Sequence, residues 1–282
     1  MVFTTSLPHI ELGQLLPPED SFKYRGNVFA VADGITRDPG GTVNWLGKDR
    51  KKLLKKYPNP SGARWAADLF CQTILREHPQ TLSALKQTFV LANRAIARLN
   101  HRHIEQVDYL INDFFACTAA AVIKRGATLH WGVIGDCGVT VFDRHGKQKF
   151  ITPDSVATFR KFINRSPQGD NRWAMPERRV LIRQQFRNNP QQIRNDHLVA
   201  YGALTGEPNA EPFMYFGSHK VAKGDLVVVY SDGFFDLLNL KTPPKLLADL
   251  NTPQSFLDYD LKLARRNPDK YGHERTLISF LA

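Results

Sequence analysis

The chain has 282 residues, a length that fits one large domain or two small ones, and we expect a single domain over 1–282. It carries 38 Lys and Arg against 27 Asp and Glu, a net charge of +11, and 42% of its residues are apolar. This apolar content excludes a disordered polycation. The charge is also too localised for a histone-like protein, because residues 48–56 carry a net +5 and residues 160–194 a net +7.

The beginning of the chain and its cysteines indicate the compartment. The first residues, MVFTTSLPHIELG, lack the basic start and apolar run of a secretory signal. The longest nearly apolar stretch, 114–123, is far shorter than the ~20 residues that cross a bilayer. Three widely spaced cysteines, an odd number, suggest no disulfide framework. We therefore expect a reduced, cytoplasmic protein with no membrane partner.

The first half of the chain predicts a strand, two helices and then a run of strands. NVFAVA at 27–32 has the apolar, β-branched character of a buried strand. Ser61 is a good N-cap for a helix that continues through Ile74, and apolar residues at steps of three and four predict a longer helix over 81–105. Three further strands follow, at 116–123, 128–135 and 139–143.

The second half begins with a stretch, 144–224, in which clean periods are few and polar residues many. We expect an irregular basic insert of loops and short helices there, without a second core. A strand at 225–230, a helix from Thr252-Pro253 to about Arg266 and a strand at 275–281 complete the pattern. Because short turns join adjacent strands, we predict an α+β fold with antiparallel sheets and helices packed outside them.

Aspartates stand where three of the predicted strands meet a turn. Asp33-Gly34 follows VFAVA, Asp136 follows WGVIG, and Asp232-Gly233 follows LVVVYS; Asp236 lies one helical turn beyond Asp232. A single Asp-Gly after a strand is usually a plain turn. Several carboxylates brought together repel one another, and such a group normally holds a hard cation such as Mg²⁺ or Mn²⁺. The pattern alone thus indicates a metal site without naming a substrate.

Five segments, taken in order, resemble the blocks of the PP2C-type metal-dependent protein phosphatases. They are Glu19-Asp20, VFAVADG at 28–34, GVIGDCG at 132–138, GDLVVVYSDGFFDLL at 224–238 and ERTLISF at 274–280. The resemblance covers about 19–143 and 224–281, and the Ser-Asp-Gly-Phe-Phe-Asp block is its most specific part. It implies a four-layer αββα sandwich, two antiparallel β-sheets flanked by helices. It also implies hydrolysis of phosphoserine and phosphothreonine in proteins through metal-activated water.

The resemblance also implies roles for individual residues. Asp33 would bridge two Mn²⁺ or Mg²⁺ ions, the Gly34 carbonyl would bind one of them, and Asp232 would bind the second. Asp136 and Asp236 would be ligands of an accessory third ion. Asp20 would orient water from outside the ligand shell.

Three departures from the family pattern bear on these roles. The closing block reads His273-Glu274-Arg275-Thr276, so the ligand position falls on His273, with Glu274 beside it as a substitute. Imidazole suits Mn²⁺ better than Mg²⁺. Ile35-Thr36 follows the first Asp-Gly in place of a glycine-rich continuation. Pro17-Pro18 stands where the family often has a phosphate-binding arginine, which leaves the phosphate-binding residue open, with Lys23, Arg25 and Arg37 as candidates.

Other functions compete with this hypothesis. The chain has no Cys-x5-Arg, P-loop, G-x-G-x-x-G or H-E-x-x-H motif. His273 at a ligand position motivates a catalytically weak or degenerate PP2C-like module that binds phosphoproteins or regulates signalling. The arginine-rich segment 160–194 would dock a phosphorylated protein substrate, because arginine forks fit phosphate. Nucleic-acid binding through 48–56 and 160–194 is a third hypothesis. We do not favour it because the four tryptophans are scattered along the chain, without the interleaving of aromatic and basic residues that stacks bases.

Overall fold

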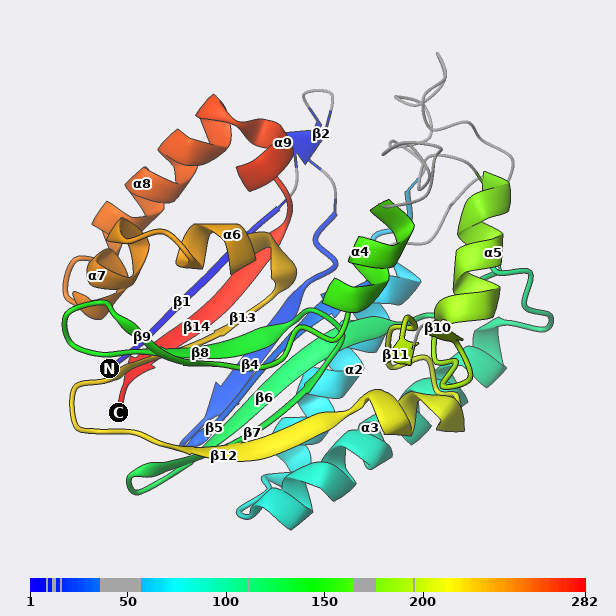
Figure 1. Ribbon diagram of the computed structural model, residues 1–282, viewed down its shortest axis with the longest axis horizontal. Helices are drawn as coiled ribbons and strands as arrows, with labels where there is room; N and C mark the ends of the chain where they lie inside the picture. The colour runs from blue at the N-terminus through cyan, green and yellow to red at the C-terminus, as the bar shows by residue number, and fades with distance from the viewer. Residues whose placement is uncertain are drawn as a thin grey trace.

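Two five-stranded antiparallel sheets form the centre of the computed structural model (Figure 1). The structure describes residues 1–8, 10–11, 14–15, 17–35, 57–110, 112–164, 176–194 and 196–282. The first sheet runs β1 (Val2–Leu7), β14 (Arg275–Leu281), β13 (Leu226–Tyr230), β8 (Gly138–Phe142) and β9 (Gln148–Ile151). The second runs β12 (Tyr215–Lys220), β7 (Thr128–Ile134), β6 (Cys117–Arg125), β5 (Val28–Gly34) and β4 (Ser21–Arg25).

The inner faces of the two sheets form an apolar core. Alternate residues of each strand point to this core, as the period of two in a strand requires. Phe29 of β5 and Phe280 of β14 stack across it with ring centroids 4.0 Å apart. Val31, Val122, Val139, Val229 and Ile278 pack around them. This contact sets the two sheets face to face.

Two long helices cover the outer face of the second sheet. They are α2 (Gly62–Glu77) and α3 (Leu82–His103). Ser61 and Thr81 cap them, each accepting a hydrogen bond from a backbone N–H three residues on. Phe70 and Phe89 meet edge to face between the two helices and the sheet, with ring centroids 5.0 Å apart.

Shorter helices cover the outer face of the first sheet. They are the 3₁₀ turn η3 (Asp232–Phe234), α6 (Phe235–Leu238), α7 (Thr242–Ala248), α8 (Pro253–Arg266) and α9 (Pro268–Tyr271). Their apolar side chains pack on Leu226, Val228 and Leu277 of the sheet. The predicted αββα sandwich is therefore confirmed, as are the predicted helices and strands, each to within about two residues at most ends.

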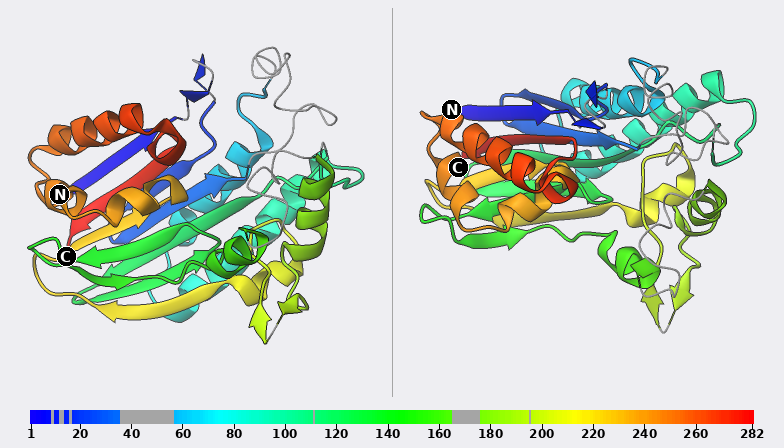
Figure 2. Two further views of the ribbon diagram at one scale, coloured as in Figure 1. Left: turned by 45° about the horizontal axis from the view of Figure 1, so that its top comes forward. Right: turned by 90° about the horizontal axis from the view of Figure 1, so that it is seen from above.

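The stretch 144–224 contains short helices, as expected, and also strands that the sequence did not predict. β9 and β12 at its two ends are edge strands of the two main sheets. Between them lie α4 (Ala157–Asn164), α5 (Pro176–Phe186), the hairpin of β10 (Ile193–Arg194) and β11 (His197–Leu198), and the 3₁₀ helix η2 (Pro208–Phe213). Figure 2 shows α4, α5 and the hairpin grouped at one end of the sheets, away from the two chain ends.

This group of elements has a small apolar cluster of its own, which the sequence did not indicate. Phe159 and Ile163 of α4 pack there against Ile182 and Phe186 of α5. Periodicity missed the cluster because each of the two helices contributes only a few apolar residues. The division of the whole chain into a single domain stays a prediction.

The remaining described elements are small. β2 (Ile10–Glu11) and β3 (Gln14–Leu15) form a short hairpin after β1. All three cysteines are free and buried, as their spacing suggested. Among the described residues, none of the helices combines the length and the apolar character that crossing a bilayer requires. The basic segment 48–56 and Arg37 lie outside the described residues.

Candidate metal centre

The fold brings together three carboxylates that lie far apart in the sequence. Asp33 is the next-to-last residue of β5, Asp136 lies in the turn between β7 and β8, and Asp232 begins η3 directly after β13. Each of the three offers a carboxylate oxygen, and these oxygens all lie within 4.8 Å of one another. The strand-end aspartates of the sequence thus converge at one point, to which both sheets contribute.

Close packing of backbone holds two of these carboxylates in place. A Cβ on Gly34 would lie 2.8 Å from backbone atoms of Ala63 and Glu19, so the residue after Asp33 must be glycine. A Cβ on Gly233 would lie 2.1 Å from the carbonyl oxygen of Glu274. Each glycine therefore lets its aspartate approach a neighbouring segment that any side chain would push away.

Asp20 is a fourth carboxylate and lies next to Asp33. It is 1% exposed, and its Oδ2 accepts a hydrogen bond of 2.6 Å from the Ser231 hydroxyl. Burial, and next the charge of Glu274, raise the pKa of Asp20 from 3.8 to about 8. Burial also raises the pKa of Asp33 well above its usual value, and the carboxylates of Asp20, Asp232 and Asp136 add to that rise.

The same effects act on Asp232. Burial among protein atoms, followed by the charge of Asp136, raises its pKa, although the side chain faces an open pocket. Carboxyl groups with raised pKa values hold protons unless a cation replaces those protons. The donors are all oxygens and carry an excess of negative charge. They therefore fit a hard divalent cation such as Mg²⁺ or Mn²⁺.

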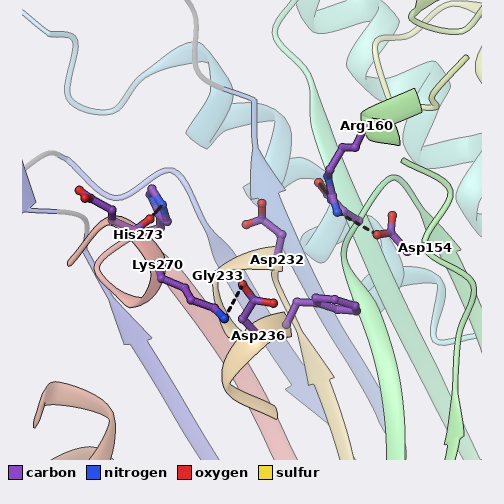
Figure 3. Close-up of a pocket in the computed structure, with 10 residues that line it drawn as sticks. Asp154, Arg160, Asp232, Gly233, Asp236, Lys270 and His273 are labelled. Carbon is purple, nitrogen blue, oxygen red and sulfur yellow. Dashed lines mark hydrogen bonds and ion pairs between the residues drawn. The ribbon is translucent and has the colours of Figure 1, made fainter. Parts of the chain in front are cut away.

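A pocket of about 400 Å³ opens above Asp232 (Figure 3). Arg160, from α4, enters one side, and its guanidinium binds Asp136 and Asp154 at 2.9 Å each. Lys270, from α9, enters the other side, 4.0 Å from Asp236. The pocket therefore has a carboxylate floor between two cationic side chains.

Sequence reasoning did not identify these two cations as parts of the site. In the sequence, Arg160 is only the first residue of the basic segment 160–194, and Lys270 belongs to no pattern. Neither has a motif around it, because each reaches the pocket through tertiary folding of a separate element.

The other expected ligands lie at the edge of the cluster. Asp236 has a half-exposed side chain, and its described ion pair is the one with Lys270. His273 lines the pocket with Nε2 2.8 Å from the carbonyl oxygen of Asp269. Figure 3 shows it to the side of Asp232, on the loop before β14. In the described residues the group of ligand oxygens within 4.8 Å contains neither side chain.

Glu274 has another role in this structure. Its carboxylate accepts hydrogen bonds from the backbone N–H groups of Glu19, at 2.8 Å, and Asp20, at 3.0 Å. Glu274 thus fastens the segment that carries Asp20 to the start of β14. Because its carboxylate binds that backbone, Glu274 is not among the described carboxylates that meet at the cluster, and no described contact supports it as a substitute metal ligand.

The basic segments contribute less to the surface than their charge suggests. In the described part of 160–194, Arg183 and Arg187 are buried and paired with Asp113, at 3.4 and 2.6 Å. They therefore cannot serve as docking groups. Of the candidate phosphate-binding residues, Arg25 lies at the end of β4 opposite to Asp20, where Nη2 donates to the Leu75 carbonyl.

No protein-family model matches the chain, and none of the curated proteins matches it. Solved structures do. The serine/threonine phosphatase PstP/Ppp of Mycobacterium tuberculosis is 18% identical with a TM-score of 0.64, and the match covers 100% of this chain and 98% of that one. The catalytic domain of PstP with two manganese ions is 18% identical with a TM-score of 0.61, covering 99% and 96%. RsbX with magnesium is 10% identical with a TM-score of 0.51, covering 100% and 94%.

The chain has the fold of the PP2C-type phosphatases. The match to PstP/Ppp covers 100% of this chain, so it takes in the described parts of 144–224 that the sequence resemblance left unmatched. At identities of 10–18% the likeness concerns the fold. The activity of this chain is a separate question, which its own residues must answer.

Proposed function

We propose that the protein is a metal-dependent phosphatase that hydrolyses phosphoserine and phosphothreonine in proteins. The observation that carries the proposal is the convergence of Asp33, Asp136 and Asp232 within 4.8 Å at the floor of an open pocket. The sequence blocks and the PP2C-type fold support it, because the carboxylates of the blocks meet where that fold joins its two sheets.

The roles of the residues follow from their positions. Asp33 would bridge the cations, Asp232 would bind one of them from the pocket side, and Asp136 would complete the group. When bound, Mn²⁺ or Mg²⁺ lowers the pKa of water and neutralises phosphate charge. Asp20 accepts a hydrogen bond from the Ser231 hydroxyl at Oδ2 and would form a further one with Asp33.

Arg160 is the residue we propose for phosphate binding. Its side chain is 42% exposed and reaches the pocket from α4. A guanidinium can bind two phosphate oxygens at once while it remains near Asp136. Arg160 would thus take the phosphate-binding role for which the family often has an arginine at the place of Pro17-Pro18. In the described segment 176–194, the half-buried Arg178 and the exposed Arg194 would extend this positive surface toward a bound phosphoprotein.

The test is hydrolysis of a phosphoserine peptide with Mn²⁺ or Mg²⁺, with and without a chelator. We expect activity that the chelator abolishes and that Asp232→Asn reduces by several orders of magnitude. Asp258→Asn makes the same change of charge on α8, away from the cluster, and should retain activity. Full activity of Asp232→Asn, or in the chelator, would refute the metal mechanism.

One observation favours a second candidate function, a degenerate module that binds phosphoproteins. Nε2 of His273 lies against the Asp269 carbonyl, and the Glu274 carboxylate accepts backbone N–H groups, so neither side chain of the closing block adds to the cluster. Calorimetry with Mn²⁺ separates the two functions. Absence of Mn²⁺ binding together with retained binding of a phosphopeptide would establish the module and exclude the enzyme.

A further inference from the structure

A buried ion pair lies directly behind the candidate metal centre. Arg275 is the first residue of β14 and is 3% exposed, and Asp260 on α8 is fully buried. Nε of Arg275 donates to both carboxylate oxygens of Asp260 at 3.0 Å, and Nη2 lies 3.0 Å from Oδ2. The pair sits beside the apolar cluster that joins α8 to the first sheet.

Stability alone gives little reason for such a pair. Removing two charges from water costs several kcal/mol per ion, and apolar residues of similar volume often stabilise a core equally well or better. Phe256, on the same helix as Asp260, is apolar and fully buried, so the neighbourhood suits apolar side chains. The pair therefore calls for a role that two apolar residues would not fill.

The guanidinium of Arg275 also contacts the loop that precedes β14. Its Nη1 donates a hydrogen bond of 2.8 Å to the carbonyl oxygen of His273. Its Cζ lies 5.9 Å from the ring centroid of Phe234, in the 3₁₀ turn that Asp232 begins. One side chain thus links α8 to both segments that border the pocket on this side.

Backbone packing transmits the position of this loop to Asp232. A Cβ on Gly233 would meet the Glu274 carbonyl oxygen at 2.1 Å and the Arg275 Cβ at 2.7 Å, so the two segments are in direct contact. Ser231 N–H donates to the Thr276 carbonyl at 2.9 Å, and Thr276 N–H donates to the Ser231 hydroxyl at 2.8 Å. Any shift of residues 273–276 therefore moves the turn that carries Asp232.

We propose that Arg275 and Asp260 are positioning residues of the metal centre. Their ion pair anchors the backbone of 273–276 to α8, and this backbone holds Asp232 at the separation from Asp33 and Asp136 at which a cation is bound. The inference rests on the proposed function, since it assigns a role toward the same cation. It predicts that the pair contributes to metal affinity more than to the stability of the metal-free protein.

The test compares Mn²⁺ affinity, measured by calorimetry, with the unfolding of the chelator-treated protein. The double variant Arg275→Met/Asp260→Leu removes both charges and approximately keeps the volume. We expect it to unfold at or above the wild-type midpoint and to bind Mn²⁺ about 10- to 100-fold more weakly, the range typical of residues that orient metal ligands. Wild-type Mn²⁺ affinity in the folded double variant would overturn the inference.

Two further variants make the result decisive. Arg183→Met/Arg187→Met/Asp113→Leu removes another buried group of ion pairs, in which Asp113 holds two arginines. No contact described for these three side chains reaches 273–276 or the Asp232 turn, so this variant should keep wild-type Mn²⁺ affinity. Arg275→Lys retains the charge but loses the fork that reaches both Asp260 and His273. It should weaken Mn²⁺ binding, and it decides the question in the same way if the double variant does not fold.

Failure of this inference is distinguishable from failure of the proposed function. If Asp232→Asn binds Mn²⁺ as tightly as the wild type, the metal centre itself is wrong. If Asp232→Asn loses binding while the Arg275→Met/Asp260→Leu variant keeps it, the centre stands and the positioning role falls.

Discussion

Replacing Asp20 with asparagine should stabilise the metal-free protein. Asp20 is 1% exposed, and its pKa is raised from 3.8 to about 8, chiefly by burial. A raised carboxyl pKa means that the folded state holds the proton more tightly than the unfolded state. The stability that this proton provides is complete below pH 3.8 and is lost as the pH rises to about 8. Asparagine resembles the protonated carboxyl at every pH and avoids this loss.

The size of the effect follows from the two pKa values. Each pH unit between them corresponds to about 1.4 kcal/mol. Between pH 5 and pH 8 the wild type should therefore lose on the order of 4 kcal/mol that Asp20→Asn retains. For a chain of this length, this is a difference in melting temperature of roughly 8 °C. The Ser231 hydroxyl can still donate to the carbonyl oxygen of the new amide, so this buried donor keeps its acceptor, and the amide NH₂ can donate to Asp33.

The assay is urea or thermal unfolding of chelator-treated protein at pH 5 and pH 8. Asp236→Asn is the matched control, because it removes the same charge nearby from a half-exposed side chain but keeps Asp20, so it should lose stability between pH 5 and pH 8 as the wild type does. The reasoning fails if Asp20→Asn is less stable than the wild type at pH 8. It also fails if its advantage is equal at the two pH values.

Three further predictions concern the cation, the phosphate and the backbone. Mn²⁺ should raise the melting temperature more at pH 8 than at pH 5, because at pH 5 protons on Asp20 and Asp33 compete with the cation. Scanning fluorimetry measures the two melting temperatures. A larger rise at pH 5 would contradict the prediction. Arg160→Met should raise KM for a phosphopeptide on the order of tenfold, the usual effect of losing a charge-assisted hydrogen bond, without weakening Mn²⁺ binding in calorimetry. Weaker Mn²⁺ binding would instead mean that Arg160 only supports Asp136. Gly233→Ala should lower the free energy of unfolding, measured by urea titration, by roughly 1–3 kcal/mol, because its Cβ would overlap the Glu274 carbonyl. It should also weaken Mn²⁺ binding. Wild-type stability of this variant would refute the close contact.

The sequence predicts the buried centre of the fold well and its edges poorly. β5 and β13 are continuous apolar runs ended by Asp-Gly, so their limits can be found from the residues alone. β12 reads YFGSHK, has no buried residue and pairs only with β7 in the second sheet. An edge strand of this kind depends on its neighbour, and its own residues carry no pattern that identifies it.

The candidate site divides in the same way. The aspartates could be predicted because they follow strands whose ends a sheet brings together. The orientation of His273 could not, because it depends on the carbonyl of Asp269 in the short helix α9, which packs against α8. The Arg275–Asp260 pair was also beyond prediction, since a charged residue at the start of an apolar strand is more often exposed than paired.

The strands β9 and β12 that bound the insert are the outermost strands of different sheets. Residues between them can be added, removed or exchanged without interrupting the ladder of either sheet, since an edge strand has a partner on one side only. The strands that position Asp33 and Asp232, β5 and β13, lie in contrast in the interior of their sheets, where a change of register would disturb neighbours on both sides. The architecture thus separates a segment whose length can change at the sheet edges from the interior strands that position the carboxylates.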